Sequence, residues 1–257
     1  ALCGKGDDAS AAGRPLRGVC WSGACQLQWQ RAEKTLNCRY RMDYLLSMLA
    51  PLWQGAQVTL KLFFITLALA LPLGLALALA RLSRWALLRT AVSGYLWLMR
   101  GTPLMLQMLF IYFALPFVPV VGVRLPDFPA AVLAFALNYA AYFAEIFRAG
   151  IEAVDRGQYE AARVLGLNYR QTMRRIVLPQ MVRRILPPMS NETITLVKDT
   201  SLIYVLALND LLRAARGIVQ RDFTITPFIV AAAFYLLMTL VLTWFFQRLE
   251  KRHAVYD

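Results

Sequence analysis

The sequence contains a single histidine, His253, and none of the short motifs that mark common catalytic or nucleotide-binding sites. It has no H-E-x-x-H or G-x-S-x-G segment, and Gly4-Lys5-Gly6 lacks the other residues of the P-loop pattern G-x-x-x-x-G-K-[ST]. An enzyme built on zinc or on an activated serine is therefore not indicated. The sequence therefore indicates no metal or cofactor site in this chain.

Acidic residues are also few, with 15 aspartates and glutamates against 28 lysines and arginines, and a formal net charge of +13. No nucleic-acid-binding motif accompanies this charge, so we assign it to contact with lipid headgroups and to orientation in a membrane. With 59% hydrophobic residues and a mean hydropathy of +0.49, the chain is too apolar for a soluble domain of this length. Composition therefore predicts an integral membrane protein.

Long uncharged runs support this class, because about 20 apolar residues are needed to cross the hydrocarbon of a bilayer. Four such runs occur, at residues 62–80, 103–123, 128–144 and 223–247. A further span is interrupted by Glu192, Lys198 and Asp199, and we retain it because the topology requires it. The prediction is an all-α membrane domain over residues 42–257 with five transmembrane helices, at about 58–80, 91–117, 128–150, 185–208 and 223–247.

Lysine and arginine usually collect on the cytoplasmic side, which orients these spans. Segments 81–100, 148–184 and 248–257 contain 15 basic residues, whereas segments 116–128 and 198–222 contain five. We therefore expect a multi-pass membrane protein, with the amino terminus outside and segment 148–184 and the carboxy terminus in the cytoplasm.

Residues 1–41 do not fit this pattern, because they hold seven basic residues and no apolar run, yet the topology places them outside. They contain all four cysteines, at positions 3, 20, 25 and 38. One interpretation is a disulfide-bearing extension outside the cytoplasm; a zinc site is less favoured, because no C-x-x-C occurs. The other is a disordered segment or one that does not belong to the natural protein, since Met42 opens a stretch typical of a chain start and no signal-peptide pattern precedes it. The redox state of the cysteines stays open.

The most distinctive segment lies in the arginine-rich stretch between the third and fourth predicted spans. Asp155 followed by Gln158 has the form of a capping box, so a short helix is predicted to start there and to end at Gly166. Asn168 and Gln171 repeat the pattern and predict a second helix. Together they predict a compact helix-glycine-helix elbow, with the second helix ending near Pro179.

The order Glu160-Ala161-Ala162, Gly166, Ile176 and Leu178-Pro179 in this elbow resembles the EAA loop of ABC-importer permeases. Segments 55–60, 100–104 with Gln107, and 198–202 are similar to the polar amino acid permeases of type I importers, and the resemblance covers about residues 55–250.

The resemblance implies a type I importer permease fold in which two permease subunits, identical or paralogous, form the pathway across the bacterial cytoplasmic membrane. It also implies two ATPase subunits that bind ATP and magnesium, and a periplasmic or extracellular solute-binding protein that delivers the amino acid. The elbow would be the coupling element that docks on an ATPase. Its implied docking residues are Gln158, Tyr159, Glu160, Ala161, Ala162, Gly166, Ile176, Leu178 and Pro179.

Polar residues within the spans are the candidates for the pathway, because a charged group there costs about 2.5–3.5 kcal/mol and normally faces a partner or a wet cavity. They form two stripes at helical spacing, one on the third span and one on the fourth. The predicted pathway residues are Asn138, Tyr142, Asn191, Glu192, Thr195 and Asp199.

Structural explanations compete with this one. Glu145 and Arg148 can pair along their helix, and Lys198 can neutralise Glu192. Arg100 is expected to reach the headgroups at the start of a span, where Pro103 opens a helix capped by Thr102.

An ion-driven carrier, or a membrane subunit without a transport role, is the alternative function. A carrier would usually show repeated halves, which five spans do not provide. The anionic stripe residues favour a cationic or zwitterionic solute, and the sequence does not identify the amino acid.

Overall fold

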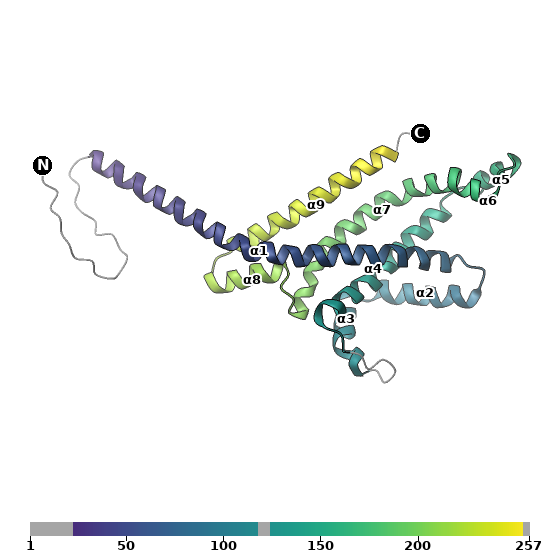
Figure 1. The fold of residues 1–257 in the computed structure, drawn as a ribbon, viewed down its shortest axis with the longest axis horizontal. Coiled ribbons are helices and arrows are strands. Elements are labelled where there is room, and N and C mark those ends of the chain that lie inside the picture. The colour runs from purple at the N-terminus through teal and green to yellow at the C-terminus, as the bar shows by residue number, and fades with distance from the viewer. Residues whose placement is uncertain (1–22, 118–123, 254–257) are drawn as a thin grey trace. The chain divides into compact units, whose positions relative to one another are not determined.

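The structure is a computed structural model that describes residues 23–117 and 124–253. These residues are mostly helical, without a strand, as the sequence predicts (Figure 1). The chain divides into two compact units, residues 1–47 and 48–257. In the first unit the helix α1 begins at Gly23, so the later half of the amino-terminal extension is helical, whereas the interpretations that concern residues 1–22 lie outside the described residues. All contacts below belong to the second unit.

The helical elements follow one another with short connections. They are α1 (Gly23–Arg81), α2 (Ala86–Gly101), α3 (Leu104–Leu109), a π-turn (Phe110–Ala114), the 3-10 turn η2 (Leu115–Phe117), α4 (Asp127–Glu152), α5 (Arg156–Val164), α6 (Tyr169–Thr172), a π-turn (Met173–Val177), α7 (Leu178–Asp199), the 3-10 helix η4 (Thr200–Leu206), α8 (Leu211–Asp222) and α9 (Thr226–His253).

Among the described residues, three helices are long and apolar enough to cross a membrane: Asp43–Arg81, Asp127–Glu152 and Thr226–Arg252. They correspond to the first, third and fifth predicted spans. The second predicted span, 91–117, is not one helix, because the backbone bends by 106° between α2 and α3, and the bent pair counts as a fourth candidate. The fourth predicted span corresponds to α7 and η4, whose charged residues keep it below the hydropathy of the others.

Helix α4 forms the centre of the packing. In its most apolar 18-residue stretch 67% of the residues are buried, against 6% in the corresponding stretch of α9. Its core side chains include Phe135, Tyr139 and Phe143, and alanines fill the space between them. Two glycines let neighbouring helices approach α4. A Cβ on Gly74 of α1 would lie 2.8 Å from the Phe143 Cβ, and one on Gly150 of α4 would lie 2.1 Å from the Ile185 Cγ2 of α7. Small residues at such crossings are typical of membrane helices.

The segment 55–60 also has a packing role, at the contact between α1 and α8. A Cβ on Gly55 would lie 2.7 Å from the backbone oxygen of Asp210, so only glycine permits this approach. The Thr59 Oγ1 accepts a hydrogen bond from the Leu211 backbone N–H at 3.4 Å, and the Asp210 carboxylate caps the first N–H groups of α8. This part of the family-like sequence therefore holds α8 against α1.

Candidate functional site

The elbow begins where Asp155 caps α5, with its Oδ1 accepting from the Gly157 N–H at 2.6 Å. The full capping box expected between Asp155 and Gln158 does not form. Instead, the Gln158 Oε1 accepts from the Gln180 Nε2 at 3.3 Å, which ties α5 to α7. The predicted start of the helix is therefore correct. The predicted return bond from the Gln158 side chain to the Asp155 backbone is wrong, because Gln158 has a partner on another helix.

Helix α5 ends at a left-handed glycine, as predicted. Gly166 has φ +73°, its N–H donates to the Arg163 oxygen at 3.0 Å, and the Leu167 N–H donates to the Ala162 oxygen at 3.0 Å. These two bonds are the Schellman arrangement, in which a residue without a side chain satisfies the last carbonyls of a helix. Gly166 therefore sets the angle of the elbow.

The second helix of the elbow starts as predicted and does not end as predicted. Asn168 and Gln171 form a complete capping box, with bonds of 2.9 and 3.0 Å in the two directions. The helix does not stop near Pro179, because the π-turn at Met173–Val177 leads the backbone into α7 without a break. Pro179 occupies the first turn of α7, where proline's missing N–H is tolerated.

The elbow presents apolar side chains to solvent in the isolated chain. Ala162 is fully buried, whereas Val164 is 88% exposed, Leu165 74% and Tyr169 77%. Tyr159 is half-buried, and this burial raises the pKa of its hydroxyl above the usual value. Large apolar residues gathered at a projecting, arginine-rich tip are typical of an interaction surface. Sequence reasoning missed these three; their signal was bulky apolar residues beside Gly166 in a polar segment.

A cavity of about 630 Å³ lies between α2, α4 and α7, a volume within the range of about 300–1,000 Å³ of small-molecule sites. Three of the six predicted pathway residues line it: Tyr142, Asn191 and Glu192. Arg100, Arg184 and Glu145 add charges of both signs to its wall. The structure therefore brings polar residues of two predicted stripes to one cavity.

Glu145 is the centre of an ion-pair cluster on one side of this cavity. Its carboxylate pairs with Arg81 of α1 at 2.7 Å, with Arg148 of α4, and with Arg100 of α2 at 3.9 Å, and Arg148 also pairs with Glu152. The expected pairing of Glu145 with Arg148 is confirmed, but it is one part of a cluster that joins three helices.

The other three predicted pathway residues do not line this cavity. Asn138 is 4% exposed, and its amide donates to the Met99 oxygen at 3.0 Å and to the Gln107 Oε1 at 2.9 Å, so it joins α4 to α2 and α3. The Asp199 carboxylate accepts from the Tyr139 hydroxyl at 2.7 Å. Thr195 donates to the backbone oxygen of Asn191 at 3.0 Å.

Three further expectations about charged and capping residues are wrong. Lys198 is exposed and forms no ion pair with Glu192 in the described part of the chain. Arg100 packs over the Tyr142 ring, 5.5 Å from its centroid, instead of pointing away from the protein.

Thr102 does not cap α3. Its hydroxyl donates back to the Leu98 oxygen at 2.8 Å and lies 2.7 Å from the Gln107 Nε2.

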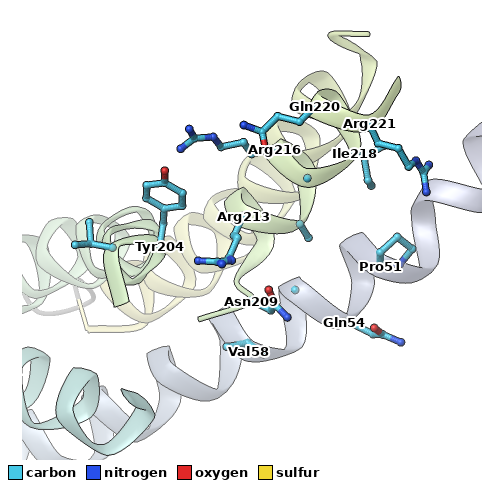
Figure 2. A pocket seen from close by; sticks show the side chains of 14 residues that line it. Pro51, Gln54, Val58, Tyr204, Asn209, Arg213, Arg216, Ile218, Gln220 and Arg221 are labelled. Carbon is cyan, nitrogen blue, oxygen red and sulfur yellow. The ribbon is translucent and has the colours of Figure 1, made fainter. Parts of the chain in front are cut away.

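A wider groove of about 1050 Å³ lies between α1, η4 and α8 (Figure 2). Figure 2 shows Gln54 and Val58 of α1 on one wall, with Arg213 and Arg216 extending from α8 on the other. The Arg216 guanidinium lies 4.9 Å from the centroid of the Tyr204 ring. In Figure 1, α8 and the elbow lie near opposite ends of α7, so this basic groove and the elbow belong to opposite ends of the helical bundle.

Residues 70–255 match the family described as the binding-protein-dependent transport system inner membrane component. The probable amino-acid ABC transporter permease protein YckA of Bacillus subtilis is 39% identical over 204 residues, covering 79% of this chain and 89% of YckA. The arginine transport system permease protein ArtQ of the same organism is 37% identical, covering 77% and 90%. The glutamine transport system permease protein GlnP of Escherichia coli K12 is 40% identical, covering 61% and 71%.

Solved structures agree with these relatives. An amino acid ABC transporter crystallised with histidines contains a chain that is 37% identical, with a TM-score of 0.74, covering 81% of this chain and 97% of that one. A chain of the MetNI methionine ABC transporter has a TM-score of 0.63 at 19% identity, which shows a shared fold alone.

Proposed function

The chain belongs to the family of binding-protein-dependent transport system inner membrane components, and from this membership we propose how its elbow and cavity act in the import of a polar amino acid. It is a helical permease subunit of the amino acid ABC importers, and it leaves ATP hydrolysis to a separate ATPase subunit. The observation that carries the proposal is the elbow, because the complete EAA spacing lies on a capped helix-glycine-helix unit that exposes apolar side chains.

The elbow is the element that couples this chain to an ATPase. The proposed docking residues are Gln158, Tyr159, Glu160, Ala161, Ala162, Gly166, Ile176, Leu178 and Pro179. Of the helix that carries the motif, Glu160 and Ala161 face solvent, whereas Ala162 is buried against the protein. We add Val164, Leu165 and Tyr169 as the apolar part of the surface, since burial of their exposed area would stabilise the contact.

The cavity between α2, α4 and α7 is part of the solute pathway. Arg100 offers a cation to the α-carboxylate of an amino acid, and Glu192 offers an anion to its ammonium group. Tyr142 and Asn191 supply neutral hydrogen-bonding groups. Such a mixed lining favours a zwitterionic solute, in keeping with the arginine, glutamine and histidine named for the relatives and the similar structure.

The full importer contains two ATPase subunits, a second permease subunit, identical or paralogous, and a solute-binding protein. Five spans with an external amino terminus and a cytoplasmic carboxy terminus place the elbow in the cytoplasm and the groove beside α8 outside. The polar groove then faces the side from which a binding protein delivers the amino acid.

Purification of the tagged chain from a mild detergent, with mass spectrometry of its copurifying chains and bound small molecules, tests the proposal. We expect an ATPase, a binding protein and an amino acid, and ATP-dependent uptake after reconstitution in liposomes. Uptake by the chain alone, driven by an ion gradient without any ATPase, would establish the carrier alternative instead.

A further inference from the structure

The bend between α2 and α3 leaves backbone groups that need partners. The chain turns by 106° at Thr102 and Pro103, so the last carbonyls of α2 cannot be satisfied by a continuing helix. Within a membrane, water is not at hand to replace those hydrogen bonds, so protein groups must supply them.

One side chain from the following helix supplies part of these hydrogen bonds. The Gln107 Nε2 lies 2.8 Å from the Met99 oxygen, 3.1 Å from the Thr102 oxygen and 2.7 Å from the Thr102 Oγ1. Gln107 is therefore a side-chain cap for the end of α2, placed there by the bend itself.

A second amide, from α4, closes the arrangement. The Asn138 Nδ2 lies 3.0 Å from the same Met99 oxygen and 2.9 Å from the Gln107 Oε1. One turn earlier in α2, the Tyr95 hydroxyl also bonds to α4, donating to the Leu137 oxygen at 2.6 Å. The end of α2 is thus tied to α4 by side-chain amides, and Asn138 is buried.

This tie lies beside a residue of the cavity. Arg100 directly follows Met99, and its guanidinium lies 5.5 Å from the centroid of the Tyr142 ring, which is one turn of α4 beyond Asn138. Fixing the Met99 carbonyl against α4 therefore fixes the backbone from which Arg100 reaches the cavity.

We propose that Gln107 and Asn138 form an amide clasp that positions Arg100 in the cavity, so that both are positioning residues for solute passage although neither touches the solute. The clasp gives a role to the segment 100–104 with Gln107, which the docking elbow does not explain. The inference rests on the proposed function of the cavity, because it requires Arg100 to act on the solute.

The test is a double-mutant cycle in the complete importer, reconstituted with its binding protein in liposomes and assayed with radiolabelled L-arginine, L-glutamine and L-histidine. Gln107→Leu removes the clasp, Gln107→Glu keeps the shape and loses the donors, and Arg100→Ala removes the positioned group. Gly94→Ala, in open space on α2, is the matched control.

We expect Gln107→Leu and Arg100→Ala each to raise the KM for uptake at least fivefold. Their combination should be no worse than Arg100→Ala alone, because groups that act through one another are not additive. Gln107→Glu should behave as Gln107→Leu does, and it decides the outcome if the leucine variant fails to assemble.

The contrary outcomes are separate for the two ideas. Normal uptake by Arg100→Ala would remove the cavity from the pathway and the clasp with it. Two other outcomes would show the clasp to be a packing contact only and would leave the cavity in the pathway. One is a defect of the Gln107 variants that adds independently to that of Arg100→Ala. The other is a lower thermal stability of the Gln107 variants with an unchanged KM.

Discussion

Two glutamates at the same cavity differ in their surroundings. Glu145 has three arginines around it, whereas Glu192 has no ion pair in the described part of the chain. A carboxylate without a counter-charge in a span is costly unless water or a solute reaches it. Glu145 therefore suits a structural role, and Glu192 suits contact with the solute.

Exchange of each glutamate for glutamine separates the two roles, because the change keeps the shape and removes the charge. Glu192→Gln should change the KM for uptake at least threefold while the complex assembles normally. Glu145→Gln leaves its arginines without their counter-charge and should lower stability by about 1–3 kcal/mol, measured as a lower Tm of the purified complex. Poor assembly of Glu192→Gln with unchanged KM in the surviving complexes would assign Glu192 to structure.

Glycine positions offer a second contrast between single residues. In Gly74→Ala the new Cβ meets the Phe143 side chain at 2.8 Å and the Ala140 oxygen at 3.0 Å, so we expect a loss of about 1–3 kcal/mol from overpacking. Gly94→Ala meets nothing within 4 Å, and alanine is the better helix former. Thermal unfolding in detergent should rank the Gly94 variant at or above the parent. An equal Tm for both variants would show that α1 and α4 move apart at little cost.

The elbow is the element whose shape depends most on one backbone angle. Proline cannot adopt the φ of +73° at Gly166, and alanine adopts it only at a cost of about 1–2 kcal/mol. A change of this angle redirects α6 relative to α5, and with it the exposed apolar surface.

We therefore expect Gly166→Pro and the surface change Glu160→Lys to leave membrane insertion intact and to abolish ATPase activity stimulated by the loaded binding protein. Gly94→Ala in α2, in open space, is the control with an unchanged rate. Stimulated ATPase activity at the parental rate in either elbow variant would refute the docking assignment.

The elements that sequence predicts well are those governed by local rules. Hydropathy finds α4 and α9, and the capping pattern at Asn168 and Gln171 finds the second elbow helix. The bend after α2 escapes such rules, because hydropathy reports an apolar environment and not the path of the backbone. The α4 residue that ties the bend, Asn138, lies far from it in sequence.

The same limit applies to the candidate site. Spacing places Tyr142 and Glu145 on one helical face correctly, but it cannot say that Asn138 on that face turns toward packed protein. The second elbow helix continues past Pro179 because a π-turn joins it to α7, and a rule based on proline alone does not predict this turn.

At the scale of the whole molecule, the chain shows surface that a single copy does not cover. Helix α9 has exposed apolar side chains along its length, at Leu236, Leu237, Leu240, Val241, Trp244 and Phe245. Such a face requires lipid or another subunit, as expected for one member of a membrane complex. In contrast, residues 48–257 form a compact unit by themselves.

That division predicts the effect of removing residues 1–41. The elbow, the cavity and the α8 groove all lie in the second unit, so the truncated chain should assemble and transport within about twofold of the parent. Uptake by reconstituted complexes checks the rate, and mass spectrometry of the native amino terminus checks whether the segment is present in the cell. Failure of the truncated chain to join the complex would show the extension to be structural.

The helical backbone runs without a break from α6 through the π-turn into α7. The second half of the elbow and one wall of the cavity therefore belong to one continuous helical rod. Glu192 lies about 20 Å along this rod from Leu178, at 1.5 Å per residue. Movement at one end of such a rod reaches the other end as tilt or axial rotation. The rod is expected to bend most easily at Pro187 and Pro188, because proline lacks the backbone N–H that donates a helical hydrogen bond. These prolines lie just before Asn191 and Glu192. If the elbow docks on an ATPase as proposed, its movement would therefore change the direction in which these two side chains point into the cavity.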